Sequence, residues 1–200
     1  MREHFLTVLK FILAILLIPI TIFITIHFSK SLSALPLEAR QAFVLGILIY
    51  TIIHLFIHEP LGIFQFGQKI VSGIFGFSAP LAAFSSVNLP FFSLFILMVF
   101  YVLTLLKKIG PYGSYLMFFA GCAWAFHIIF MAKQLREQTE GVARATYILS
   151  AQLIFIFNCS LMAAIFVLLF HKFPFVLFFQ DTFYSARDFY VSVFRQLFVP

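Results

Sequence analysis

The sequence predicts an all-α integral membrane protein, a polytopic helix bundle with five or six transmembrane spans and a C-terminal amphipathic helix at the membrane interface. Of the 200 residues, 63% are hydrophobic and only 10% are charged, and the mean hydropathy is +1.08. Soluble domains are about half apolar and about a quarter charged, so this composition excludes a soluble globule. Apolar runs close to the roughly 20 residues that a helix needs to cross a bilayer recur along the chain.

The first span is predicted at residues 5–28, because this apolar run is longer than the core of a signal peptide and lacks a small-residue cleavage site. The other predicted spans are 41–57, 61–77, 89–106, 112–132 and 145–170. The segment 61–77 is glycine-rich and long enough only if it is tilted, so it either spans or re-enters the membrane. The connections are short and no internal repeat is visible, which predicts a single domain over residues 1–200.

Residues 176–198 have the pattern of an amphipathic helix. Its apolar positions recur at helical spacing: Phe179, Phe183, Ala186, Tyr190, Val193 and Leu197. Its polar positions share the other face: Asp181, Ser185, Asp188, Ser192 and Arg195. Such a helix lies in the membrane interface or packs on a partner subunit, and the pattern supports both readings equally.

The net charge of +6 does not indicate a nucleic-acid partner, because the basic residues lie mostly at the ends of the spans. Positive-inside bias and snorkelling of long side chains explain that distribution. The expected partners are the lipid bilayer and other integral membrane subunits. Cys122 and Cys159 lie inside apolar spans without metal-ligand spacing, which favours packing as small hydrophobic side chains.

Ionisable residues inside a span are expensive and therefore mark candidate functional positions. The candidates are Lys69, His54, His58, Glu59 and His127, and the uncharged polar residues are Gln68, Gln152 and Asn158. We expect Gln152 and Asn158 to hydrogen-bond between helices. Small residues let membrane helices approach closely, and the glycines expected at helix contacts are Gly46, Gly62, Gly67, Gly73, Gly76, Gly113 and Gly121.

The histidines allow two cofactor hypotheses beside a purely structural role. His54 and His58 share a helix face, and with Glu59 and His127 they could form a zinc site. The sequence favours the simpler interpretation that His58 and Glu59 reach the lipid headgroups, because it does not fix the third ligand that a zinc site needs. His54 and His127 could instead be the axial ligands of haem b, with Gly121 leaving room for the ring.

A family resemblance rests on three stretches: HLFIHEPLGIFQFGQKIVSGIFGF (residues 54–77), NLPFFSLFILMVF (88–100) and FFAGCAWAFHIIF (118–130). Their spacing resembles small bacterial membrane metallopeptidases of the site-2 protease class over about residues 46–170. These enzymes carry a His-Glu-x-x-His motif whose histidines bind zinc and whose glutamate activates water. In this chain Gln68, Lys69 and Ser72 occupy the motif positions, so the resemblance implies that the zinc site and the hydrolytic activity are absent.

The resemblance predicts that the Lys69 ammonium fills the buried pocket in which the related enzymes hold zinc. It also predicts a non-catalytic pseudo-protease scaffold, an accessory or assembly subunit of a larger complex in the bacterial inner (cytoplasmic) membrane, without a cofactor. The alternatives are a membrane metalloenzyme with a relocated histidine and glutamate site, and a haem-binding electron-transfer subunit.

Overall fold

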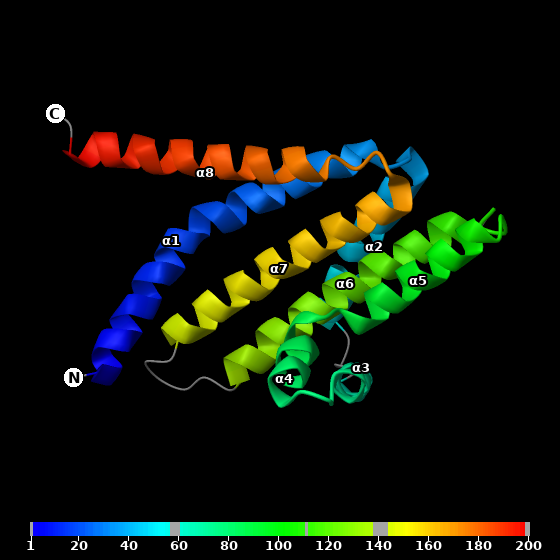
Figure 1. The fold of residues 1–200 in the computed structure, drawn as a ribbon, viewed down its shortest axis with the longest axis horizontal. Coiled ribbons are helices and arrows are strands. Elements are labelled where there is room, and N and C mark those ends of the chain that lie inside the picture. The colour runs from blue at the N-terminus through cyan, green and yellow to red at the C-terminus, as the bar shows by residue number, and fades with distance from the viewer. Residues whose placement is uncertain (1, 57–60, 111, 138–143, 199–200) are drawn as a thin grey trace. The chain divides into compact units, whose positions relative to one another are not determined.

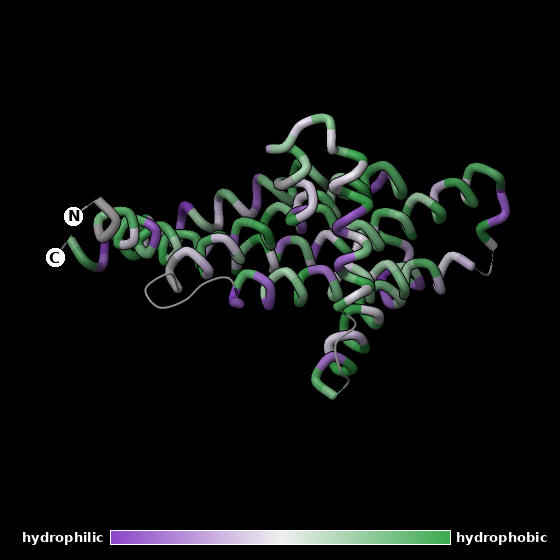
Figure 2. Tube along the Cα trace, turned by 90° about the horizontal axis from the view of Figure 1, so that it is seen from below, coloured by the Kyte–Doolittle hydropathy of each residue, from purple (hydrophilic) through white to green (hydrophobic). Residues whose placement is uncertain are grey.

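The computed structural model describes residues 2–56, 61–110, 112–137 and 144–198, and within them the chain is helical and contains no strand (Figure 1). This confirms the all-α prediction. Hydrophobic residues, in green, recur throughout the helical segments (Figure 2). The described residues form two compact units: Met1–Leu35 with Leu135–Pro200, and Pro36–Gln134. The prediction of a single domain stays a prediction.

The first unit contains α1 (Arg2–Ser31), the short 3-10 helix η1 (Leu32–Ala34), α7 (Arg144–Phe170) and α8 (Phe175–Phe198). Both α7 and α8 pack against α1. The core is an aromatic cluster in which the Phe28 ring lies 6.3 Å from Phe166 and 6.1 Å from Phe178. Phe28 is buried, as expected for a ring that joins three helices.

The turn between α7 and α8 has a clear local cause. His171 follows the last residue of α7 with a φ of 51°, the left-handed conformation that commonly ends a helix. Pro174 then stands directly before α8, a position where its missing N–H is harmless. These residues send α8 back beside the second half of α1 (Figure 1).

The second unit contains α2 (Leu37–Phe56), α3 (Leu61–Ile74), α4 (Ala79–Asn88), α5 (Phe91–Leu105) and most of α6 (Tyr112–Glu137). The helix α3 packs against both α4 and α5. Residues 79–88 were expected to be a connection between spans, and that prediction was wrong because they form α4. Pro90, which lacks an N–H, separates α4 from α5, and the two helices meet at an 80° bend.

Four helical segments are long and apolar enough to cross a membrane: Phe5–Ala34, Leu37–Phe56, Tyr112–Glu137 and Thr146–Phe170. The bent pair α4–α5 is a fifth candidate if it forms one broken span. The expected number was five or six. The difference lies at residues 61–77, where α3 has only 14 residues, about 21 Å at 1.5 Å per residue, against a bilayer core of roughly 30 Å.

Two of the predicted glycine contacts are backbone contacts. A Cβ atom on Gly46 would collide with the carbonyl oxygen of Phe118 in α6, and one on Gly121 would collide with that of Phe43 in α2. These two glycines therefore set the close approach of α2 and α6. Gly67 meets the ring of Phe92, with 2.9 Å between the added Cβ and the nearest carbon.

The other four glycines make no close contact with the backbone of another helix among the described residues. Gly113 makes only ordinary contacts, and Gly76 meets backbone atoms of its own segment. Gly62 and Gly73 have no neighbouring atom within 4 Å of an added Cβ among the described residues, so the contacts predicted for these two are wrong. Glycine enrichment in residues 61–77 thus reflects close packing at Gly67 only.

Candidate functional site

Gln68 joins three helices of the second unit. Its amide nitrogen lies 3.0 Å from Oε1 of Gln134 in α6 and 3.3 Å from the backbone oxygen of Ser86 in α4. The sulfur of Met131 lies 3.7 Å from the same nitrogen. An amide that donates to two acceptors on different helices fixes their mutual position, so Gln68 has a structural role at the first motif position.

The residues at the other two motif positions, Ser72 and Lys69, make no contribution to such a junction in the described part of the chain: one bonds within α3 and the other is exposed. Ser72 donates to the backbone oxygen of Gln68 at 2.7 Å, a bond within α3. Lys69 is exposed on α3. The prediction that its ammonium occupies a buried pocket is therefore wrong, since neighbouring helical positions point about 100° apart and Gln68 takes the inward direction.

His127 is the most deeply placed candidate. It is 5% exposed and lies on α6 beside the α4–α5 bend. The bend leaves the last carbonyl groups of α4 without partners in their own helix, and the backbone of Val87 and Asn88 hydrogen-bonds to the imidazole. His127 thus satisfies the end of a broken helix, which is what makes irregular backbone tolerable within a membrane protein.

A small pocket lies next to His127, between α3, the α4–α5 bend and α6. Its lining is apolar except for Gln68 and His127, and it includes the rings of Phe64, Phe91, Phe92 and Phe126. The Phe64 ring centroid is 6.0 Å from that of His127 and 5.8 Å from that of Phe126. The Nε2 atom of His127 is buried and has no hydrogen-bond partner among the described residues.

Among the described residues, no three potential ligand side chains form a group. The proposed zinc site stays a prediction, because only His54 and His127 of its four residues belong to the described part of the chain. His58 and Glu59 lie outside the described residues. His54 is half-buried, stacks on Tyr50 and meets the edge of Phe130, so it contacts two aromatic rings. The space that haem would need beside Gly121 is taken by the α2 backbone.

Gln152 and Asn158 lie on α7. The Nδ2 atom of Asn158 donates to the Ile154 oxygen of its own helix at 2.9 Å, which is not the contact between helices that the sequence predicts. Gln152 is half-buried, and its Oε1 atom has no partner among the described residues. The predicted hydrogen bonds of Gln152 and Asn158 between helices stay a prediction.

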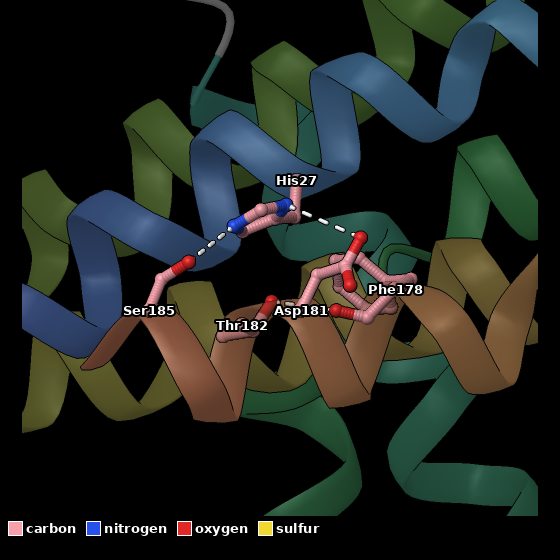
Figure 3. A network of polar contacts seen from close by, with 5 residues as sticks. All are labelled: His27, Phe178, Asp181, Thr182 and Ser185. Carbon is pink, nitrogen blue, oxygen red and sulfur yellow. Dashed lines mark hydrogen bonds and ion pairs between the residues drawn. The ribbon is translucent and has the colours of Figure 1, made fainter. Parts of the chain in front are cut away.

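A second polar site, in the first unit, was not predicted from the sequence (Figure 3). Nε2 of His27 in α1 lies 3.0 Å from Oγ of Ser185 in α8, and Nδ1 lies 3.9 Å from Oδ2 of Asp181. Asp181 and Ser185 are four residues apart, so they share one face of α8. The sequence feature that could have indicated this site is His27, a polar residue within the predicted span 5–28. Another such residue is Lys10, whose Nζ lies 3.3 Å from Oγ1 of Thr146 in α7.

The His27 site has the residue types of a serine nucleophile, a base and an orienting carboxylate, but the geometry favours packing. Ser185 lies within the continuous helix α8, whose backbone N–H groups are used in the helix and cannot stabilise an oxyanion. The side chain of Asp181 is 57% exposed. No family model, no curated protein and no solved structure matches this chain.

Proposed function

We propose that this chain is a non-catalytic membrane scaffold, an accessory or assembly subunit of a larger complex in the bacterial cytoplasmic membrane. The observation that carries the proposal is the role of Gln68, which holds α3, α4 and α6 together from the first motif position. Amide and hydroxyl groups committed to structural hydrogen bonds are poor zinc ligands. The pseudo-protease resemblance remains part of the proposal.

The surface supports association within the membrane. Large apolar side chains are exposed along α1, α2 and α5, as lipid or partner helices require. Lys69 adds an ammonium on the exposed side of α3, between the exposed residues Phe66 and Ile74. An amine in apolar surroundings is stabilised by a carboxylate or phosphate acceptor, so this side of α3 suits an acidic group on a neighbouring subunit or lipid.

The proposal is tested by site-specific photo-crosslinking in native membranes. A benzophenone amino acid replaces Lys69, and the matched control replaces Val71 of the same helix, which is 3% exposed. We expect one discrete protein adduct from position 69 and none from position 71. Removing the captured protein should then destabilise or disperse the complex that contains this chain.

Two results would overturn the proposal. The first is a monomer in mild detergent whose position 69 captures only lipid. The second is stoichiometric zinc by elemental analysis, or a haem Soret band, in the purified protein, because either would show a site with its own chemistry.

A further inference from the structure

The pocket beside His127 is lined by a buried imidazole that has one nitrogen without a hydrogen-bond partner among the described residues. The imidazole is nine-tenths or more buried and meets the carbonyl groups at the end of α4 with one side of the ring. The Nε2 atom has no partner among the described residues, and the pocket lies next to the ring. A buried polar atom without a partner is unusual in a folded protein, so we expect a bound molecule to supply the missing hydrogen bond.

The chemistry of that occupant follows from the ring. An imidazole that donates a proton to a carbonyl through one nitrogen presents an acceptor on the other nitrogen. The missing group is therefore a hydrogen-bond donor. Metal binding is not supported, since the residues that line the pocket include one imidazole and no thiolate or carboxylate.

The walls of the pocket select an occupant that is otherwise apolar. Four phenylalanine rings face it, and Gln68, the other polar side chain of the lining, already donates its amide hydrogens to Gln134 and Ser86. The pocket that His127 lines has room for one group of about the size of a hydroxyl, and it is not sealed. A hydroxyl at the end of an alkyl chain combines a small donor, which fits the pocket, with an apolar body that can extend out through its opening.

We propose that this pocket binds the hydroxyl end of an aliphatic alcohol, with the hydroxyl donating to Nε2 of His127. The α4–α5 bend is part of the site, because Leu89, Phe91 and Phe92 at the bend close one side of it. The inference does not depend on partner binding. It concerns a small ligand within the second unit, so its test can fail while the scaffold role is correct, and the reverse.

The chain provides its own reporter. Trp124 is the only tryptophan and lies one helical turn before His127 on α6. Bromine quenches indole fluorescence at short range, so a brominated alcohol reports its own arrival. The two probes are 2-bromoethanol and 1-bromopropane, which differ by the replacement of a hydroxyl with a methyl group. Their partition into empty detergent micelles is measured first and used to correct both titrations.

We expect saturable quenching of Trp124 by 2-bromoethanol and about tenfold weaker quenching by 1-bromopropane, as for loss of one buried hydrogen bond. His127→Phe should abolish the difference between the probes, whereas the control His54→Phe should preserve it. The long-chain probe 2-bromododecan-1-ol separates the two sources of the hydroxyl. Tighter quenching by this probe identifies a lipid alcohol, and quenching by the short probe alone identifies a small free alcohol.

Equal quenching by the two short probes in the wild-type protein overturns the proposal, because the hydroxyl would then not be recognised. Quenching without saturation overturns it as well, since Nε2 would be satisfied by water alone. Both results come from the unmodified chain, so the test does not depend on whether His127→Phe folds. A probe difference that survives unchanged in a folded His127→Phe variant also contradicts the assignment.

Discussion

The Nε2 atom of His27 lies 3.0 Å from the Oγ atom of Ser185, which links α1 to α8 through a buried imidazole. The surrounding contacts show that the helices run antiparallel, with Phe28 against Phe178 and Phe23 against Phe189. The hydroxyl of Tyr190 reaches the backbone oxygen of Leu16 further along. The contact therefore sits within an extended interface and fixes its register.

Replacing Ser185 with alanine should destabilise the first unit. The change leaves Nε2 of His27 without its partner in a largely buried position, and an unsatisfied buried group costs about 1–3 kcal/mol. The matched control is Ser192→Ala on the same helix, because Ser192 is exposed. Thermal unfolding of both variants in detergent measures the difference, and equal stabilities would show that the His27 contact is dispensable.

Ser185 should also fail to behave as an enzymatic nucleophile. An activated serine needs oxyanion donors beside it, and the interior of α8 offers no free backbone N–H group there. We expect a fluorophosphonate probe to label the wild-type chain no more than Ser185→Ala. Labelling that disappears in Ser185→Ala and in His27→Ala would instead establish a catalytic serine.

Gly121→Ala should be among the most destabilising single changes in the second unit. The new methyl group meets backbone rather than a flexible side chain, so α2 and α6 must separate, at a cost of about 3 kcal/mol, the upper end of the usual range for overpacking. Gly73→Ala is the control. It has free space for the methyl group and is the second-to-last residue of α3, so its stability should change by less than about 0.5 kcal/mol. Equal effects in thermal unfolding would contradict the predicted α2–α6 contact.

Composition and hydropathy were sufficient to predict the long apolar helices, because burial in lipid imposes long apolar runs that can be counted. The short helix α4 was missed, since its 10 residues form no such run. The helix at 176–198 was predicted within one residue of the observed Phe175–Phe198. What it packs against was not predictable from its periodicity. Ser185, placed on its polar face, contacts α1, while Phe183 and Leu197 from the predicted apolar face are exposed. Periodicity decides which residues share a face but not what that face meets.

The candidate site was harder to predict than the helices. His127 was singled out as a polar residue within a span, and it is buried beside a pocket. Its contacts depend on the break at Pro90, which leaves backbone carbonyl groups for a side chain distant in sequence. Lys69 was assigned to the interior because a charged residue in a span suggests function. It is exposed, whereas Gln68, one position earlier on the same helix, points inward.

Gln68 and Lys69 should therefore respond in opposite ways to removal of their polar groups. Gln68→Leu takes the donor from Gln134 and from the Ser86 carbonyl, and polar contacts between membrane helices are each worth roughly 0.6–1.7 kcal/mol. We expect a loss of about 1–2 kcal/mol. Lys69→Met keeps the length of an exposed side chain and should change stability by less than about 0.5 kcal/mol. Unfolding both variants in detergent with increasing SDS gives the comparison.

If Lys69→Met proved the more damaging change, the ammonium would have to be buried after all, and Gln68 would not be the residue that holds α3, α4 and α6 together.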